Sequence, residues 1–568
     1  MTASIAWTAL ATSSKDMGFL NKNVSDKIDI LNKLLGAGCD LIEGGYPGSN
    51  EKDRQFFKWC REQLSPQSFA KLVAFGSTRR KNSSVNDDPQ LKQIVDSGVT
   101  NACIVAKGSL KHVTNILGTT AEENLEMLRD TVTYLKGEGL TVFVDLEHFY
   151  DGYAESKSYS TRLIETCVAS GASAIVLCDT NGASLPETIT RITSSLPALP
   201  SSVMYGVHTH NDMSLSVANS LAAVEAGAKM IQGTINGIGE RTGNADLTTL
   251  VAILNLRMPY ETAMEPSSLT QLSQDVNDAC NLEGQRNQPF VGLDAFAHKG
   301  GLHAAAMRKD EFSYQFIKPS EVGNVGRICM SELSGRGSVM SRLQEAGLTD
   351  GGEEFVKEKV EAILNRLKYL ESKGYSFEGA DASLNLMMLH ATKNYCAPFK
   401  LLDFSVQVNE LAQTTDKKHG INKIGWYSGD ETSRATVSVE ALIDDTENEG
   451  GAVSRLVAAD GKGPVDAVAS ALKKALETFF PILSEVNLVD YRVVILDRDK
   501  ATKAACRVLI TFESTKSKNT WSTVSVSTNT ISASVNALVD GFEYAILEEE
   551  EKNYLCDVDW DSGDSAWE

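Results

Sequence analysis

The chain has 568 residues, which is enough for two or three domains with a large apolar core. Its formal net charge of −21 argues against nonspecific binding to nucleic acid or to an anionic membrane, because both need basic surfaces. The sequence holds no run of 18 apolar residues and no signal or transit pattern, so we expect a cytoplasmic protein that does not cross a membrane. The 10 cysteines show no paired spacing, which predicts reduced and mostly buried thiols.

The first 257 residues alternate short β-branched runs with longer stretches of helical periodicity. A glycine stands just before many of the runs, where a helix that ends needs a left-handed residue. Eight such pairs in about 250 residues match a (β/α)8 barrel, and a doubly wound sheet is the alternative. The expected strands are Ser4–Leu10, Cys39–Gly44, Lys71–Gly76, Asn101–Ala106, Thr141–His148, Ala172–Asp179, Val203–His210 and Ala228–Ile235.

Polar residues gather where these runs end, and the active sites of such barrels lie at the carboxyl ends of the strands. The seventh run ends in His208-Thr209-His210, and residues two apart on a strand point to the same side. Two imidazoles on one side are spaced to share a divalent metal ion, although a half-buried pair at a strand end is the plainer interpretation. After the eighth run follows a glycine-rich polar loop, 237–244, which favours the metal site.

The rest of the chain divides by composition. Residues 258–400 look helical and irregular, and residues 401–547 look like a strand-strand-helix unit used twice. The tail has nine acidic residues and one lysine, which predicts a solvated segment. The expected architecture is therefore a catalytic barrel (1–257), a helical linker subdomain (258–400), an α+β regulatory domain (401–547) and an acidic tail (548–568).

Several motifs together resemble those of one family, the acyl-CoA Claisen-condensing enzymes that include the isopropylmalate, homocitrate and citramalate synthases. The resemblance covers nearly the whole chain and is strongest to the citramalate synthase branch. It is carried by the segments Ile42–Asn50, Ala74–Arg80, Glu147–Gly152, Leu177–Gly182 and Gly461–Ala467.

The resemblance implies site residues. His208, His210 and Asn244 would bind a divalent metal (Mg, Mn or Zn), together with an aspartate from the first strand. Thr180 would help to hold the carboxylate of a keto acid, and Glu147 would order the site near the metal. His303 would be delivered to a neighbouring protomer's barrel, where it would assist deprotonation of the acetyl-CoA methyl group.

The implied reaction joins acetyl-CoA, pyruvate and water to give (R)-citramalate and CoA, on the route to isoleucine. A homodimer is implied as well. The segment that holds Gly461, Gly463 and Asp466 would lie near a feedback site for isoleucine or leucine.

The first strand departs from the family pattern, which ends in Asp-Thr-Thr-Leu-Arg-Asp-Gly. An alignment on Leu10 places Ala11 and Thr12 where the family has its Arg-Asp pair, whereas an alignment on charge places Lys15 and Asp16 there. Lysine cannot reproduce the planar fork of an arginine. In the second alignment Asp16 would be the remaining metal ligand and Lys15 would replace the catalytic arginine.

This departure leaves alternatives open. The chain is an active synthase that uses Lys15 and Asp16, a catalytically impaired paralogue with a regulatory or structural role, or a sequence whose first strand was mis-assembled. An isopropylmalate synthase-like activity on a larger keto acid is a further alternative. A lyase of the same barrel class is the weakest one, because simple lyases of this class lack a C-terminal domain.

Overall fold

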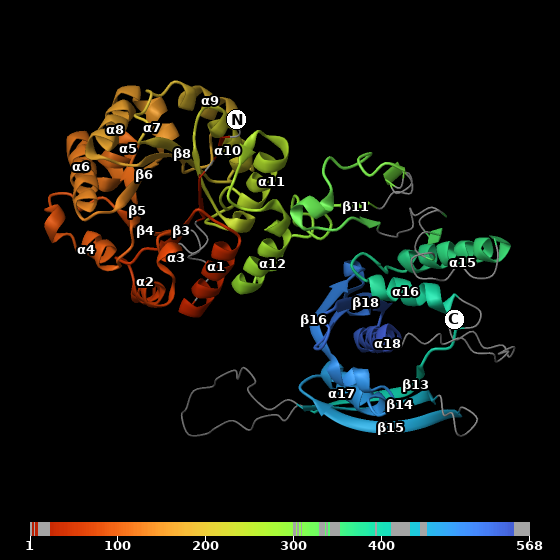
Figure 1. The fold of residues 1–568 in the computed structure, drawn as a ribbon. Helices are drawn as coiled ribbons and strands as arrows, with labels where there is room; N and C mark the ends of the chain where they lie inside the picture. Colours follow the sequence, from red (N-terminus) through yellow and green to blue (C-terminus); the bar gives the residue numbers. More distant parts are fainter. Residues whose placement is uncertain are drawn as a thin grey trace, which may run out of the picture. The chain divides into compact units, whose positions relative to one another are not determined.

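Eight parallel strands close into a barrel in the computed structural model (Figure 1), which describes residues 3–4, 6–9, 23–298, 303, 306–307, 309–328, 336, 339–340, 343, 353–391, 395–409, 432–443 and 451–549. This confirms the predicted barrel and excludes the doubly wound sheet. The strands are β2 (Ala6–Ala9), β3 (Leu41–Gly45), β4 (Leu72–Ser77), β5 (Asn101–Lys107), β6 (Thr141–Glu147), β7 (Ala174–Asp179), β8 (Met204–Thr209) and β9 (Met230–Gly233).

Helices surround the barrel and cover the outer faces of its strands (Figure 1). Five glycines predicted to end helices, Gly38, Gly98, Gly139, Gly171 and Gly227, all have a positive φ, between 79° and 108°. Only glycine adopts this conformation without strain. The helices are α1 (Val24–Gly36), α2 (Glu51–Gln63), α3 (Pro66–Phe69), α4 (Pro89–Asp96), α5 (Leu110–His112), α6 (Ala121–Gly137), α7 (Phe149–Glu155), α8 (Lys157–Ser170), α9 (Pro186–Ser194), α10 (Ser216–Glu225), α11 (Leu247–Arg257) and α12 (Leu269–Cys280).

The barrel interior is filled by side chains that alternate along the strands. Phe143, Val176 and Met230 belong to one buried apolar cluster inside the barrel. Two residues further along β6 and β9, the same inward side carries Asp145 and Gln232, which are buried and polar. The interior therefore changes from apolar to polar toward the carboxyl ends of the strands, where the predicted site lies.

A second compact unit contains residues 298–314 and 328–568, of which part is described. Its core joins two antiparallel three-stranded sheets to helices α17 and α18. The remaining elements are the short strands β1 (Ala3–Ser4), β10 (Tyr260–Glu261), β11 (Ala297–His298) and β12 (Arg327–Ile328), then α15 (Glu353–Ser372), α16 (Asp381–His390), β13 (Phe399–Asn409), β14 (Thr432–Ile443), β15 (Gly451–Gly461), α17 (Pro464–Leu476), β16 (Val486–Ile495), β17 (Cys506–Ser514), β18 (Thr520–Ser527) and α18 (Thr530–Glu549).

The predicted strand-strand-helix unit was wrong in one respect, because each unit has three strands before its helix. The strand that the sequence did not reveal is β15. Three of its 11 residues are alanine and two are glycine, both of which are depleted in strands, and Leu456 on it is 72% exposed. Pairing with β14 along its whole length, and not its own composition, makes this segment a strand.

The structure bears on two expectations from the sequence, the absence of a membrane span and the reduced state of the cysteines. None of the described helices is long and apolar enough to span a bilayer. Seven described cysteines are free and six of them are buried, but Cys396 is bonded in a disulfide, which corrects the expectation that every cysteine is reduced.

Candidate active site

His208 and His210 lie at the carboxyl end of β8 and turn toward one another. Their Nε2 atoms are 3.2 Å apart, and both residues are buried. Two nitrogens that share one metal ion at about 2.1 Å each lie roughly 3.0–3.4 Å apart, so the observed distance suits a common ion. The prediction that both imidazoles point to the same side of the strand is therefore met by the geometry.

The glycine loop after β9 brings Asn244 beside this pair. Asn244 forms an antiparallel bridge with His210, and its backbone N–H donates to the Gly237 carbonyl at 3.0 Å. Gly237 and Gly243 have φ values of 65° and 98°, and a Cβ on Gly243 would lie only 2.0 Å from the Gly237 oxygen. The tight fold of the loop thus depends on glycine at position 243.

The side chain of Asn244 fits a metal ligand. It is 1% exposed, and neither its amide oxygen nor its amide nitrogen meets a hydrogen-bond partner among the described residues. A buried polar group without a partner costs about 1–3 kcal/mol, which a bound cation would offset. Two imidazole nitrogens and one amide oxygen are donors that divalent transition metals accept.

The predicted carboxylate ligand cannot be placed, because Lys15 and Asp16 lie outside the described residues. Within the part of the chain that the structure describes, no group of three or more His, Cys, Asp or Glu side chains is arranged around a common point. The described donors are therefore the two histidines and the asparagine.

Glu147 occupies the mouth of the barrel at the end of β6. It forms an ion pair with Lys107, which is its register partner at the end of β5. Phe143 and Asp145 precede it on the same inward side, so Glu147 continues the row of side chains that rises from the apolar interior.

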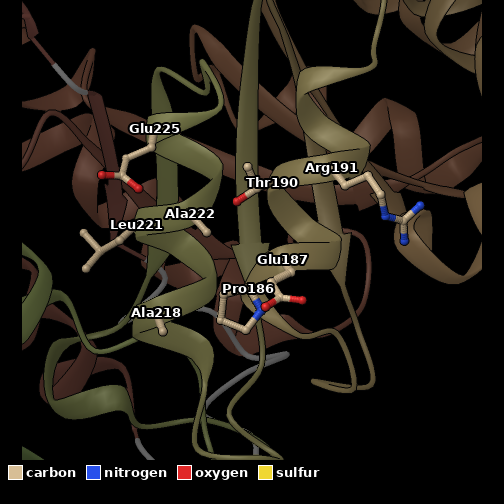
Figure 2. A pocket seen from close by; sticks show the side chains of 8 residues that line it. All are labelled: Pro186, Glu187, Thr190, Arg191, Ala218, Leu221, Ala222 and Glu225. Atoms are coloured by element: carbon tan, nitrogen blue, oxygen red, sulfur yellow. The ribbon is translucent and has the colours of Figure 1, made fainter.

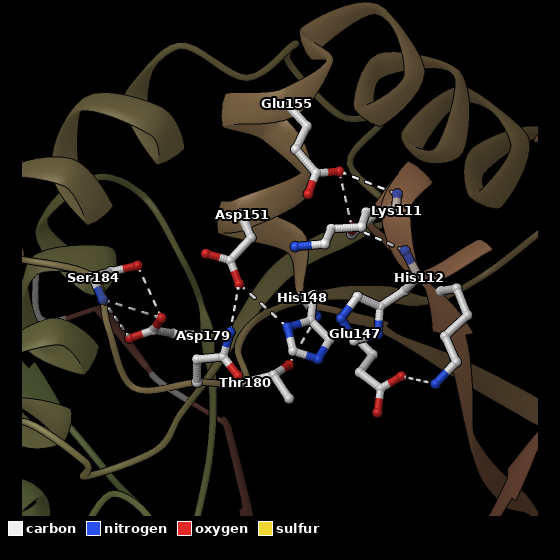
Figure 3. A network of polar contacts seen from close by, with 12 residues as sticks. Lys111, His112, Glu147, His148, Asp151, Glu155, Asp179, Thr180 and Ser184 are labelled. Carbon is white, nitrogen blue, oxygen red and sulfur yellow. Dashed lines mark hydrogen bonds and ion pairs between the residues drawn. The ribbon is translucent and has the colours of Figure 1, made fainter. Parts of the chain in front are cut away.

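Thr180 is held by the backbone of a neighbouring loop. The N–H of His148 donates to Thr180 Oγ1 at 2.8 Å, and His148 adopts the left-handed conformation with φ of 60°. Because this bond uses a lone pair of the hydroxyl, its proton remains available to donate. Figure 3 shows Thr180 next to His148 and Asp151, and the hydrogen bond from His148 lowers the pKa of the Asp151 carboxyl.

Arg241 ties the loops of the mouth together. Its Nε and Nη2 atoms donate to the two oxygens of Asp212 at 2.8 and 2.9 Å, and Nη2 also donates to the Thr180 carbonyl at 2.9 Å. Hydrogen bonding from this guanidinium lowers the pKa of Asp212. The loops after β7, β8 and β9 are thereby fastened to one another.

Some of the polar residues at the carboxyl ends of the strands bind other parts of the barrel and not the site. Arg79, after β4, donates to Asp130 and Glu123 of α6 at 2.7 and 2.8 Å, so it fastens a helix to the barrel. Asp179 accepts hydrogen bonds from the backbone N–H and from the hydroxyl of Ser184, and burial raises the pKa of its carboxyl. Both residues stabilise the fold, although their position at strand ends drew attention to them.

His303 and the glycine segment belong to the second unit. The exposed ring of His303 stacks on Tyr314 with ring centres 3.9 Å apart. Gly463 is the N-cap of α17, and Asp466 accepts a hydrogen bond from the Lys462 N–H at 2.8 Å. A Cβ on Gly461 would lie 2.4 Å from the Ala467 nitrogen, so the chain passes close to the start of the helix there.

One surface groove lies away from all these residues. It runs between α9 and α10, and Figure 2 shows Glu187, Arg191 and Glu225 among the side chains that line it. None of the predicted site residues lines this groove.

Asp145 and Gln232 are the site residues that the sequence did not single out. Gln232 bridges the carboxylate of Asp145 and the ring of His208, and all three are buried. A signal was present, since each directly follows an apolar run within its strand, but their 87-residue separation hides the contact.

Comparisons with known proteins agree on one family. Residues 20–276 match the HMGL-like model, residues 290–374 the homocitrate synthase post-HMGL domain-like model, and residues 378–546 the LeuA allosteric (dimerisation) domain model. The chain is 39% identical to an (R)-citramalate synthase of Aquifex aeolicus, over 94% of this chain and 96% of that protein.

Two further comparisons have lower identity or lower coverage. A 2-isopropylmalate synthase of Methanocaldococcus jannaschii is 28% identical, over 92% of this chain and 91% of that one. A crystal structure of a Bacillus subtilis HMG-CoA lyase superposes with a TM-score of 0.43 at 20% identity, and covers 50% of this chain and 98% of that chain.

Replacement of Gly243 by alanine should loosen the loop that carries Asn244, because the new Cβ would collide with the Gly237 carbonyl. We expect faster amide hydrogen exchange in residues 208–214 and 235–246 of the Gly243→Ala chain. Gly139→Ala is the matched control, since Gly139 also has a positive φ but no atom within 4 Å of the new Cβ. Equal exchange in the two variants would contradict the role of the loop.

Proposed function

The chain belongs to the acyl-CoA Claisen-condensing family of isopropylmalate, homocitrate and citramalate synthases, and on that premise we propose that it condenses acetyl-CoA with pyruvate. The products are (R)-citramalate and CoA, on the route to isoleucine. The supporting observation is a difference in sequence identity. Five (R)-citramalate synthases match at 37–39% across nearly their full length, whereas a 2-isopropylmalate synthase, a probable 2-isopropylmalate synthase and one putative (R)-citramalate synthase match at 28%. This difference favours pyruvate over a larger keto acid.

His208, His210 and Asn244 would hold a divalent metal ion, with Asp16 as the proposed fourth ligand. When bound, such an ion polarises the keto carbonyl and so makes it a better electrophile. The Asn244 amide, which is buried and lacks a described hydrogen-bond partner, supports this assignment.

Thr180 and Glu147 are proposed to orient the keto acid. The Thr180 hydroxyl accepts from the His148 N–H, so its proton points elsewhere and can bind the substrate carboxylate. Glu147 is paired with Lys107, which neutralises its charge and limits its repulsion of an anionic substrate at the mouth. Together the two residues select an orientation and do not supply the nucleophile.

The nucleophile is the methyl carbon of acetyl-CoA. In the proposal the His303 imidazole accepts a proton from that methyl group, and the resulting enolate forms a carbon–carbon bond with the keto carbon of pyruvate. Lys15 would stabilise the oxygen that becomes negative as the carbonyl double bond opens, and that oxygen would then take the proton from His303 to give the hydroxyl group of citramalate. Water then cleaves the thioester and releases the CoA thiol and a carboxylate, which makes the reaction irreversible.

Acetyl-CoA and pyruvate incubated with the purified full chain and Mn²⁺ should therefore yield free CoA thiol and citramalate. Asn244→Ala and His208→Ala should each reduce kcat by about a thousandfold, because removal of a metal ligand costs several kcal/mol of transition-state stabilisation. Asn86→Ala, at an exposed turn, is the control and should keep the parent rate. Thiol release and chiral chromatography of the product are the measurements.

The same assay decides between the synthase and the impaired paralogue. Asp16→Asn should lower both turnover and metal content if Asp16 completes the ligand set. A purified chain that binds Mn²⁺ nowhere and releases no thiol would be the impaired paralogue, with a regulatory or structural role that fits the missing Arg-Asp pair.

The second unit is proposed to bind an amino-acid effector, isoleucine or leucine, near Gly461, Gly463 and Asp466. Support comes from the match to a LeuA allosteric (dimerisation) domain over residues 378–546. We further propose that the expected boundaries at residues 257, 400 and 547 separate catalytic, linker and regulatory parts. A cytoplasmic location is proposed as well. It is in line with the seven free cysteines among the described residues, of which six are buried and Cys506 is half-buried.

Gly463→Val should raise the isoleucine concentration for half-inhibition at least about tenfold. Gly463 is extended and no atom lies within 4 Å of its missing Cβ, so valine fits this chain while it blocks whatever binds there. Gly137→Val, at another open glycine, is the control. Inhibition curves that coincide for the two variants would place the effector elsewhere.

A homodimer is proposed because the second unit exposes apolar edge strands. Leu456 on β15 is 72% exposed, and Val494 and Ile495 on β16 are exposed as well. Both strands stand at the edges of their sheets. Exposed apolar edges of this kind invite pairing with another chain.

Leu456→Arg combined with Val494→Arg should convert the assembly from two chains to one in sedimentation velocity, since arginine is costly to bury in an apolar interface. Leu185→Arg, at an exposed apolar residue of the barrel unit, should leave the mass unchanged. A double variant that still sediments as two chains would remove β15 and β16 from the interface.

A further inference from the structure

A buried chain of hydrogen bonds joins three strands of the barrel behind the histidine pair. Gln232 Nε2 on β9 donates to Asp145 Oδ1 on β6 at 2.9 Å, and Gln232 Oε1 lies 2.8 Å from His208 Nδ1 on β8. The three residues are 1–4% exposed. Gln232 is the register partner of His208, so the contact is built into the pairing of the strands.

The chemistry of the three groups fixes the direction of these bonds. A carboxylate only accepts hydrogen bonds, so the amino side of the Gln232 amide must face Asp145. The amide oxygen is left for His208, and because an amide oxygen cannot donate, the hydrogen must lie on His208 Nδ1. A neutral imidazole with hydrogen on Nδ1 carries its lone pair on Nε2, and this atom faces His210.

We propose that Asp145 and Gln232 are positioning residues that hold His208 in the tautomer with hydrogen on Nδ1, so that its Nε2 is the metal-binding atom. The link to metal binding rests on the proposed function, but the tautomer itself does not. Histidines that bind metals commonly donate their second N–H to a carboxylate or carbonyl oxygen, which fixes the ring and raises its affinity. Here an amide is inserted between the ring and the carboxylate.

The groups around Gln232 favour one fixed direction for its hydrogen bonds with Asp145 and His208. Below the three residues lies the apolar cluster with Phe143 and Met230, in which the Cys103 thiol is the group that meets Gln232. Cys103 is 3.7 Å from Gln232 Nε2, and burial raises the pKa of its thiol well above the ordinary value. The thiol therefore stays neutral, and Asp145 is the stronger acceptor for the amide.

The test uses the metal-free full chain labelled with ¹⁵N-histidine. Long-range ¹H–¹⁵N spectra should show His208 with hydrogen on Nδ1 in the parent protein, and both tautomers in Gln232→Met, which keeps the shape but removes the amide. The matched control is Gln288→Met, because Gln288 also contacts a carboxylate, that of Asp246, and is mostly buried.

Metal affinity supplies a second readout. Competition of Mn²⁺ with a fluorescent chelator should show an affinity about 10–100-fold weaker in Gln232→Met and within about twofold of the parent in Gln288→Met. In a His208→Ala background, Gln232→Met should cause no further loss, because the amide acts through that ring.

An unchanged tautomer in Gln232→Met, or a further loss of affinity in the double variant, would overturn the proposal. If Gln232→Met does not fold, Asp145→Asn serves instead, since an amide there can pair with Gln232 in either direction and should also yield both tautomers. A parent protein that binds no Mn²⁺ but shows the fixed tautomer, lost in Gln232→Met, would sink the proposed function and uphold this inference.

Discussion

The bridge between His210 and Asn244 is the contact on which the mouth of the barrel depends. It joins the end of β8 to the loop after β9, and it exists because Gly237 and Gly243 let that loop turn back on itself. Without the bridge, the two imidazoles would remain at the strand end with no amide oxygen beside them. The proposed ligand set, which spans two strands, therefore rests on a few backbone hydrogen bonds and on the lack of a Cβ at one position.

Around this bridge the barrel supplies support in layers. The lowest is apolar, the next holds Asp145 and Gln232, and the uppermost holds Glu147 with Lys107. Successive layers are two residues apart along a strand, because every second side chain points into the barrel. The spacing in the sequence therefore determines the layer in which a side chain lies. The loops at the mouth are then held by Arg241, which contacts both Asp212 and the Thr180 carbonyl. Rigid strands thus set the orientation of the donors, and the loops close the rim.

The sequence predicted much of this arrangement, for identifiable reasons. All eight barrel strands and the glycines that precede them follow from local signals, and the His-x-His spacing placed both rings on one side. The strand β15 escaped because pairing and not composition makes it a strand. The contact of Gln232 with Asp145 escaped because it joins distant segments. Lys15 and Asp16 stay predictions, since they lie outside the described residues and before residue 20, where the HMGL-like match begins.

The central claim is that His208, His210 and Asn244 bind one divalent metal ion in a citramalate synthase. Pulsed electron paramagnetic resonance of the Mn²⁺-loaded full chain measures this directly, because the electron spin couples to nitrogen nuclei bonded to the ion. We predict couplings to two histidine nitrogens, one of which disappears in His208→Ala and the other in His210→Ala. A spectrum without histidine nitrogen couplings, or one that neither substitution changes, would contradict the account.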